Sequence, residues 1–220
     1  GAAVAAVAMA YAVPAGFDPR DPRTAHQPPP TLDGLGNGDL RGLRVGVFRP
    51  WFEDAEADIV SVSAIDDLVY ERPRSVDLLR GQVPGSDNRF HLVAEFDGEV
   101  VGHAGLMVVA DEGHVTTVAV HPDVQGGGVG TCLLAGLCRA AVAAGLASMT
   151  LEVRVSNEAA IGLYRRFGFA PAGVRPRYYA DRDEDALIMW LHDIGDPAFL
   201  ERVEAACVAD PVNRGGDTGG

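Results

Sequence analysis

Short runs of alternating apolar and polar residues mark the middle of this chain, and they predict most of its regular elements. Runs in which every second residue is apolar are typical of strands that bury one face. Helices are predicted where apolar residues recur every three or four positions, as at Leu133, Leu134 and Leu137. The predicted strands cover residues 44–48, 91–96, 100–110, 115–120, 149–155 and 186–191. The predicted helices cover residues 53–70, 75–82, 131–144, 157–167 and 197–208.

Glycine, proline and small polar residues mark the ends of these elements. Asp97-Gly98 separates two predicted strands and favours a tight hairpin turn, so those strands should pair antiparallel. Pro73 and Pro122 stop the elements before them, because proline lacks the N–H that a helix or a sheet needs. Ser75 is expected to cap the helix that follows it.

A glycine-rich turn, Gln125-Gly126-Gly127-Gly128-Val129-Gly130, joins the strand at 115–120 to the next helix. A turn without side chains at the start of a helix lets backbone N–H groups approach a phosphate, so a pyrophosphate is the expected ligand. The glycines do not have the G-x-G-x-x-G spacing of a dinucleotide site, and a Walker loop needs a lysine, which this chain lacks. Glycine-rich turns also occur without any ligand, and this motif alone leaves that alternative open.

The charge and the reactive side chains restrict the possible partners. With 31 Asp and Glu against 18 Lys and Arg, the formal net charge is −13, which repels nucleic acid and anionic membranes and attracts basic peptides or amines. Cys132, Cys138 and Cys207 are odd in number and lack metal-ligand spacing, which predicts the cytoplasm and no disulfide framework. The six histidines form no ligand motif, so no metal is expected.

The first 42 residues differ in composition from the rest. Their alanine-rich start lacks the basic region of a secretory signal, and the residues after it are rich in Pro, Asp, Gly and Asn. No segment reaches the roughly 20 consecutive apolar residues that span a bilayer. We expect a partly irregular linker at 1–42, a compact domain at 43–196, and a C-terminal helix with a disordered tail at 197–220.

Four motifs together resemble the GNAT superfamily of acyl-CoA-dependent N-acetyltransferases. They are Gln125-x-x-Gly128-x-Gly130, Leu151-Glu152-Val153-Arg154, Asn157-Glu158-Ala159-Ala160-Ile161 and Leu163-Tyr164-x-x-x-Gly168-Phe169. The resemblance implies an α+β fold, in which a mixed, mostly antiparallel sheet splays between its fourth and fifth strands and helices cover both faces. It implies acetyl-CoA as co-substrate, held by Val118, Ala119, Val120, Gln125, Gly126, Gly127, Gly128, Val129, Gly130, Thr131 and Asn157.

Residues 65–191 are most similar to the ribosomal-protein-alanine N-acetyltransferases, which modify protein N-termini. This similarity implies that Glu152 is the general base and Tyr164 the general acid. Independently, a carboxylate in a partly desolvated cleft can take the proton of an ammonium, and a phenol can protonate a departing thiolate. The structural alternatives are that Glu152 pairs with Arg154, that Tyr164 is a core aromatic, and that Asn157 only caps a helix.

Three residues are candidate contacts of the acceptor amine. Arg74 occupies a position where these relatives usually carry an aromatic residue, and Tyr178 and Tyr179 could line the acceptor site or simply pack on one another. The predicted acceptor is the α-amino group of a protein N-terminus. The alternatives are a small-molecule amine, and a fusion remnant that binds coenzyme A without turnover.

Residues 1 to about 60 resemble an interior fragment of an amidase-signature enzyme, through 15–22 and 39–47. The lysine of that family's Ser, cis-Ser and Lys triad is missing, as is its glycine/serine-rich segment, so amidase activity is not expected. We expect residues 44–48 and 53–70 to supply the first strand and first helix of the acetyltransferase sheet.

Overall fold

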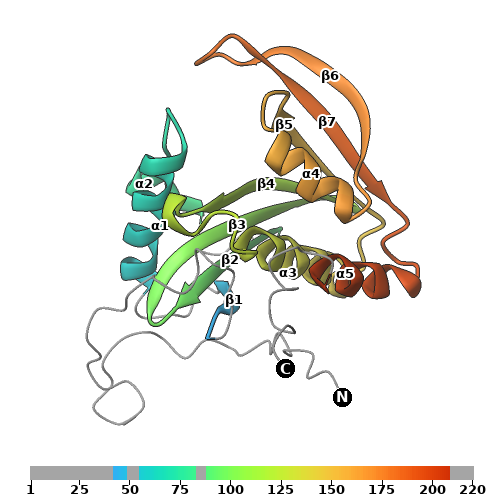
Figure 1. The fold of residues 1–220 in the computed structure, drawn as a ribbon, viewed down its shortest axis with the longest axis horizontal. Helices are drawn as coiled ribbons and strands as arrows, with labels where there is room; N and C mark the ends of the chain where they lie inside the picture. The colour runs from blue at the N-terminus through green and yellow to red at the C-terminus, as the bar shows by residue number, and fades with distance from the viewer. Residues whose placement is uncertain (1–41, 49–54, 83–87, 209–220) are drawn as a thin grey trace, which may run out of the picture.

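The computed structural model describes residues 42–48, 55–82 and 88–208 (Figure 1). The predictions for 1–41, for the helix start at 53–54 and for the tail beyond 208 therefore lie outside the described residues. The strands are β1 Arg44–Phe48, β2 Arg89–Phe96, β3 Glu99–Val109, β4 Glu112–Val120, β5 Ser148–Arg154, β6 Ala170–Tyr179 and β7 Glu184–His192. The helices are α1 Ala55–Val69, α2 Val76–Gln82, the short 3-10 helix η3 Pro122–Val124, α3 Val129–Ala143, α4 Glu158–Arg166 and α5 Ala198–Val208.

The described strands form one sheet in the order β1-β2-β3-β4-β5-β7-β6. Neighbouring strands pair antiparallel except β4 and β5, which run parallel. The predicted α+β class and the mixed, mostly antiparallel sheet are confirmed. None of the described helices is both long enough and apolar enough to cross a membrane.

The turn and cap residues behave as the sequence predicts. Asp97 and Gly98 have φ angles of 49° and 88°, the left-handed values that a two-residue type I′ hairpin needs. The Leu78 N–H donates to Ser75 Oγ at 3.2 Å and caps α2. Gly145, with φ of 72°, follows the end of α3.

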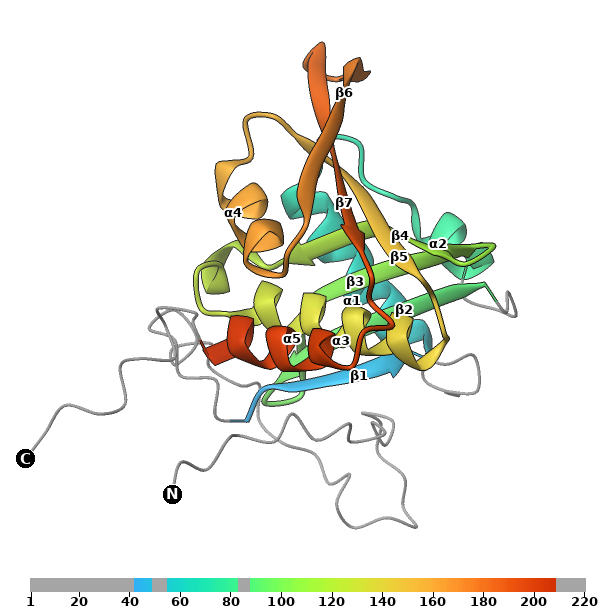
Figure 2. The ribbon, with the colours of Figure 1, turned by 90° about the vertical axis from the view of Figure 1, so that its right-hand side faces the viewer.

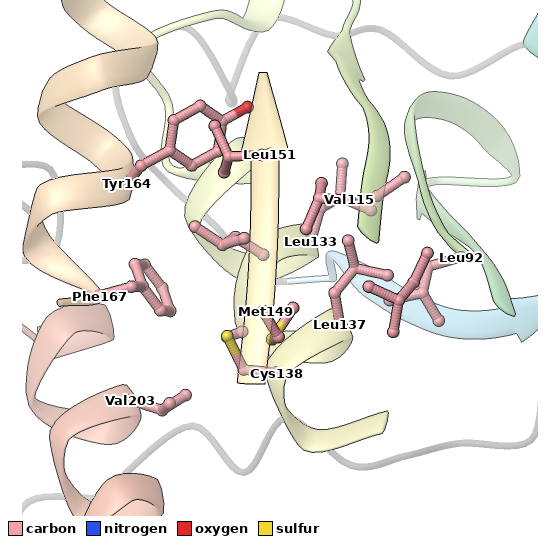
Figure 3. Close-up of a cluster of buried hydrophobic side chains, with 14 of the residues drawn as sticks. Leu92, Val115, Leu133, Leu137, Cys138, Met149, Leu151, Tyr164, Phe167 and Val203 are labelled. Atoms are coloured by element: carbon pink, nitrogen blue, oxygen red, sulfur yellow. The ribbon is translucent and has the colours of Figure 1, made fainter. Parts of the chain in front are cut away.

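Helices cover both faces of the sheet, with α1 and α2 on one side and α3 and α5 on the other (Figures 1 and 2). Two consecutive residues of β3 define these faces. A Cβ placed at Gly102 would lie 3.1 Å from Leu133 of α3, whereas His103 bonds to Asp66 of α1. The main core fills the α3 side, where Leu133, Leu137 and Met149 are fully buried (Figure 3). The α5 helix joins this core through Phe199 and Val203, which are equally buried.

The sheet opens at its centre, as predicted. Strands β4 and β5 pair only from Glu112 with Ser148 to Val115 with Leu151. Beyond these pairs β4 continues to Val120 and β5 to Arg154 without pairing to each other. The residues after Val115 and Leu151 therefore border the opening between the two strands.

The sequence pattern did not predict strand β6. Its sequence, Ala-Pro-Ala-Gly-Val-Arg-Pro-Arg-Tyr-Tyr, has no apolar alternation, and its side chains are exposed along nearly the whole length. It is the last strand of the sheet and pairs only with β7, with register shifts near both prolines. An edge strand tolerates proline because one side of its backbone needs no sheet partner.

Strand β1 confirms the strand predicted at 44–48. It pairs antiparallel with β2 from Arg44 with Glu95 to Phe48 with His91. Val45 is buried against the α3 side, where a Cβ at Gly136 would lie 3.5 Å from its side chain. Residues 44–48 therefore supply one of the two edge strands of this sheet.

Candidate active site

The glycine-rich turn leaves backbone N–H groups at the mouth of α3. Gly126 and Gly128 have φ angles of 78° and 88°, which L side chains rarely adopt. Gly128 is the N-cap of α3 and has no side chain to bond the first N–H groups of the helix, which have no partner within the helix itself. This is the local geometry that binds an anion, and it agrees with the expectation of a pyrophosphate.

Two side chains fix this turn to its surroundings. Gln125 Nε2 donates to the carbonyl of Val120 at 3.0 Å and holds the turn against the end of β4. Arg166, on α4, donates from Nη2 to Thr131 Oγ1 at 3.2 Å, in the first turn of α3. No local sequence pattern indicated Arg166, because it lies 35 residues from Thr131 along the chain and only the fold brings the two together.

The strand segment predicted to hold acetyl-CoA lies where β4 leaves β5. Val118, Ala119 and Val120 pair with β3 on one side, and none of the three pairs with β5 on the other. A bulge sits just before them, because Leu106 pairs with Val115 while Gly105 pairs with Thr117. The extra residue, Thr116, fits opposite Gly105 because glycine has no Cβ. A Cβ at that position would lie only 2.6 Å from the Thr116 hydroxyl.

Glu152 lies on β5 one residue beyond the last pair with β4. Its neighbours Leu151 and Val153 point into the core, so the carboxylate points to the opposite face of the strand. The side chain is 23% exposed, and Oε1 lies 3.2 Å from Nη2 of Arg175 on β6. Arg175 is therefore the ion-pair partner, in place of the Arg154 considered from the sequence. No local sequence signal indicated it, because the contact comes from strand β6.

Tyr164 projects from α4 beside Leu151 (Figure 3). Its ring stacks edge-on against Phe169 with centroids 5.9 Å apart, so the core role considered from the sequence is real. Burial, together with the nearby phenols of Tyr70 and Tyr179, raises the pKa of Tyr164 above its usual value. The phenol thus keeps its proton at neutral pH, as a general acid requires.

Asn157 caps α4, since its side chain accepts a hydrogen bond from the Ala160 N–H at 3.0 Å. This contact fits the structural alternative considered from the sequence. It is a local bond within the turn that leads from β5 into the helix carrying Tyr164. The predicted contact of Asn157 with the donor stays a prediction.

The two adjacent tyrosines of β6 have different environments. Tyr179 donates from its hydroxyl to the backbone carbonyl of Glu152 at 3.2 Å, and the guanidinium of Arg154 lies 4.1 Å from its ring centroid. Burial, followed by the proximity of Tyr178, raises the pKa of Tyr179 to about 12. Tyr178 is half-exposed and meets Tyr179 edge-on, with centroids 5.1 Å apart. Tyr179 therefore lies beside Glu152, and Tyr178 lies on the outer side of the pair.

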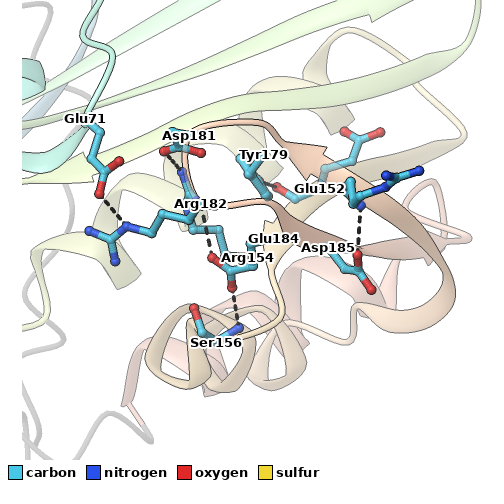
Figure 4. Close-up of polar contacts among 10 residues, drawn as sticks. Glu71, Glu152, Arg154, Ser156, Tyr179, Asp181, Arg182, Glu184 and Asp185 are labelled. Carbon is cyan, nitrogen blue, oxygen red and sulfur yellow. Dashed lines mark hydrogen bonds and ion pairs between the residues drawn. The ribbon is translucent and has the colours of Figure 1, made fainter.

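Ion pairs hold the end of β5 to the β6–β7 turn (Figure 4). Arg154 pairs with Asp181 and lies 3.1 Å from Glu184. Glu184 also accepts the Ser156 N–H at 2.9 Å. These contacts lower the pKa of both carboxyl groups, that of Asp181 through Arg154 and that of Glu184 chiefly through Ser156.

The structure turns Arg74 inward. Its guanidinium binds both carboxylate oxygens of the buried Asp66, at 2.8 and 3.1 Å, and His103 Nε2 lies 2.9 Å from the same carboxylate. Burial opposes ionisation of Asp66, but the bonds from His103 and Arg74 outweigh it, so its pKa lies below the ordinary value. Arg74 also borders a small cavity of about 30 Å³ between α1, α2 and the sheet, room for about one water. Neither Glu152 nor Tyr164 lines that cavity.

The arrangement suits transfer of an acyl group from a phosphate-bearing donor. The opening between β4 and β5 is bordered by an unpaired strand edge and by the partly buried carboxylate of Glu152. The N-terminus of α3 has the geometry of a phosphate site, and Tyr164 on α4 offers a protonated phenol. Within the described residues, no group of three His, Cys, Asp or Glu side chains is placed to hold a metal ion.

Comparisons with known proteins agree with this chemistry. Residues 57–169 match the model of the Acetyltransferase (GNAT) family. A Bacillus subtilis protein, provisionally named a [ribosomal protein bS18]-alanine N-acetyltransferase, is 35% identical over 134 residues, which cover 61% of this chain and 89% of the relative. The Escherichia coli [ribosomal protein bS18]-alanine N-acetyltransferase is 43% identical over 97 residues, 43% of this chain and 66% of the relative.

Solved structures give the same result. The crystal structure of the Escherichia coli ribosomal-protein-S18-alanine N-acetyltransferase superposes with a TM-score of 0.57 at 33% identity and covers 62% of this chain and 88% of that one. Ard1 from Thermoplasma volcanium superposes with a TM-score of 0.59 at 26% identity, over 69% of this chain and 97% of that one. The chain belongs to the GNAT family and is an acyl-CoA-dependent N-acetyltransferase.

Proposed function

We propose that this enzyme transfers an acetyl group from acetyl-CoA to the α-amino group of a protein N-terminus, by direct attack in a ternary complex. The observation that carries the proposal is the position of Glu152, one residue past the last β4–β5 pair and next to the opening. The family supports acetyl-CoA as the donor. The named substrate of two relatives, a ribosomal protein alanine, supports a protein N-terminus as the acceptor.

In this proposal Glu152 takes a proton from the acceptor ammonium, directly or through a water, and exposes the nitrogen lone pair. The nitrogen attacks the thioester carbonyl, and its bond to carbon forms as the carbonyl oxygen becomes negative. A backbone N–H along Val118, Ala119 and Val120 stabilises that oxyanion, because their edge of β4 has no β5 partner. Arg175, whose Nη2 lies 3.2 Å from Oε1 of Glu152, keeps the carboxylate oriented.

Collapse of the intermediate breaks the carbon–sulfur bond. Tyr164 donates its proton to the departing thiolate, and its raised pKa keeps that proton available across the neutral range. N–H groups of the turn from Gly126 to Thr131 bind the pyrophosphate of the donor, apart from that of Gly127, which donates to the Val124 carbonyl. As the neutral amide forms, the attacking nitrogen loses its second proton to water, and a proton from water restores the Tyr164 phenol. The amide product leaves with the coenzyme thiol, and no covalent enzyme intermediate forms.

Mass spectrometry tests the acceptor directly. The full chain is incubated with acetyl-CoA and a panel of peptides that have free or blocked N-termini, together with small amines. We expect a mass gain of one acetyl group on peptides with a free N-terminus only. If only the small amines are acetylated, the acceptor is a small-molecule amine. If no product is acetylated, the chain is better described as a fusion remnant that binds coenzyme A without turnover.

Glu152→Gln tests the base. Loss of a general base should lower kcat/KM by about 10²-fold to 10⁴-fold, while the calorimetric Kd for acetyl-CoA stays within about twofold. Glu99→Gln is the matched control, since Glu99 is an exposed carboxylate at the start of β3. Equal rates for Glu152→Gln and the parent would remove Glu152 from the mechanism.

A further inference from the structure

One ion pair joins two loops that are far apart in the sequence. Glu71, in the loop between α1 and α2, pairs with Arg182 in the β6–β7 turn, 111 residues away. Figure 4 shows the Arg182 side chain extending from the turn to the Glu71 carboxylate. The side chains are 43% and 65% exposed, so water and salt screen this pair strongly.

The Glu71 side of the pair is anchored to β4. The preceding residue, Tyr70, makes a hydrogen bond of 2.8 Å between its hydroxyl and Thr117 Oγ1, on the β4 stretch that has left β5. The same loop is held by Arg74, which binds the buried Asp66 with two hydrogen bonds. Glu71 therefore projects from a loop that is fixed on both sides.

The Arg182 side of the pair is anchored to β5. Asp181, its neighbour in the turn, pairs with Arg154 at the end of β5. Glu184, at the start of β7, holds both Arg154 and the Ser156 N–H. The β6–β7 turn is thus bonded to the end of β5, and the α1–α2 loop is bonded to β4.

The Glu71–Arg182 ion pair therefore spans the opening between β4 and β5. It does so at the end of the opening that lies away from the last β4–β5 backbone pair. We propose that Glu71 and Arg182 form a latch that closes this end of the opening, and that an acceptor reaches Glu152 only when the latch separates. The inference rests on the proposed function, because it concerns the acceptor's path to the proposed base.

Hydrogen exchange measured by mass spectrometry tests the latch without any substrate. In the variants Glu71→Gln and Arg182→Gln, the backbone amides of 70–72, 74–75 and 180–183 should exchange about twofold to fivefold faster than in the parent, the range expected for one exposed ion pair. High salt should produce the same change in the parent. Arg177→Gln is the matched control, because it removes an exposed arginine from the same hairpin and leaves the latch intact.

The charge-reversed double variant, Glu71→Arg with Arg182→Glu, should restore the slow exchange. Neither Glu71→Arg alone nor Arg182→Glu alone should restore the slow exchange. Unchanged exchange in both glutamine variants would show that the pair does not hold the two loops together and would overturn the proposal.

Steady-state kinetics then test the effect on the acceptor, with a peptide that carries no charged side chain. A latch that must open lowers the fraction of enzyme ready to bind, so separating it should lower the acceptor KM about twofold to fivefold and leave kcat and the acetyl-CoA Kd unchanged. An unchanged KM would overturn the proposal. A higher KM would overturn it too, because the pair would then close over a bound acceptor.

The two proposals fail in different ways. A parent enzyme that acetylates no peptide contradicts the proposed function. The exchange measurement still supports or contradicts the latch in that case, because it needs neither donor nor acceptor.

Discussion

At the scale of single residues, the donor site depends on backbone geometry, but one cation lies beside it. Arg166 reaches the hydroxyl of Thr131 at the mouth of α3, in a chain whose formal net charge is −13. Bringing a phosphate group to so acidic a protein costs electrostatic energy unless a positive charge lies close to it. Arg166 is well placed to provide that charge.

We expect Arg166→Gln to weaken coenzyme A binding by about tenfold, the value of one charge-assisted contact with a phosphate. Isothermal titration calorimetry at constant ionic strength measures the effect. Arg165→Gln is the control, because it removes the same charge from the neighbouring exposed position. Equal losses in both variants would indicate a general charge effect, with no specific contact at Arg166.

Tyr164→Phe separates the chemical role of this residue from its packing role. The ring contact with Phe169 survives in the variant, so the midpoint of thermal unfolding should change little. The proton donor is lost, and kcat should fall by about 10²-fold. A large fall in the unfolding midpoint with normal kcat would mean that Tyr164 serves the core alone.

At the scale of elements, local signals explain what the sequence could predict. The Asp97-Gly98 turn, the Ser75 cap and the apolar stripe of α3 are each encoded within a few residues, and the structure confirms all three. Strand β6 depends on pairing with β7 and has no pattern of its own. The bulge at Thr116 and the partner of Glu152 depend on distant strands in the same way, so no local motif indicated them.

The edge strand β1 has a measurable role. A fragment of residues 55–208 lacks it and leaves β2 as an exposed edge, without the buried Val45. Compared with a fragment of residues 43–208, we expect a thermal midpoint lower by about 5 °C or more, from the loss of a few kcal/mol. Circular dichroism melts measure the difference. Equal midpoints would mean that β1 contributes nothing to the stability of the sheet.

At the scale of the whole molecule, the two faces of the sheet differ in polarity. The face covered by α1 encloses polar groups, whereas the face covered by α3 is apolar. Asp66 and His103 are buried there and bonded to each other. In the described part of the chain, the buried Nε2 of His91 has no hydrogen-bond partner. Burial, and then the charges of Arg74, Arg89 and His103, lower the pKa of His91 from 6.5 to about 4.

This shift predicts sensitivity to acid. Folded His91 binds fewer protons than the unfolded chain, so its contribution to stability is complete above pH 6.5 and is lost as the pH falls toward 4. The free energy of unfolding should fall by up to about 1.4 kcal/mol per pH unit in that window from this group. Urea titrations at several pH values should show a smaller slope for His91→Gln, and identical slopes would contradict the assignment.

The short β4–β5 pairing also divides the sheet at a single point in the chain. Strands β1 to β4 all come before Gly145, and strands β5 to β7 all come after it. A cut at Gly145 would therefore yield two polypeptides, each with an uninterrupted half sheet. Their reunion would depend on the short β4–β5 pairing, on contacts of α3 with α5 and on any donor that touches both halves. We expect such a split enzyme to report coenzyme concentration through fragment complementation.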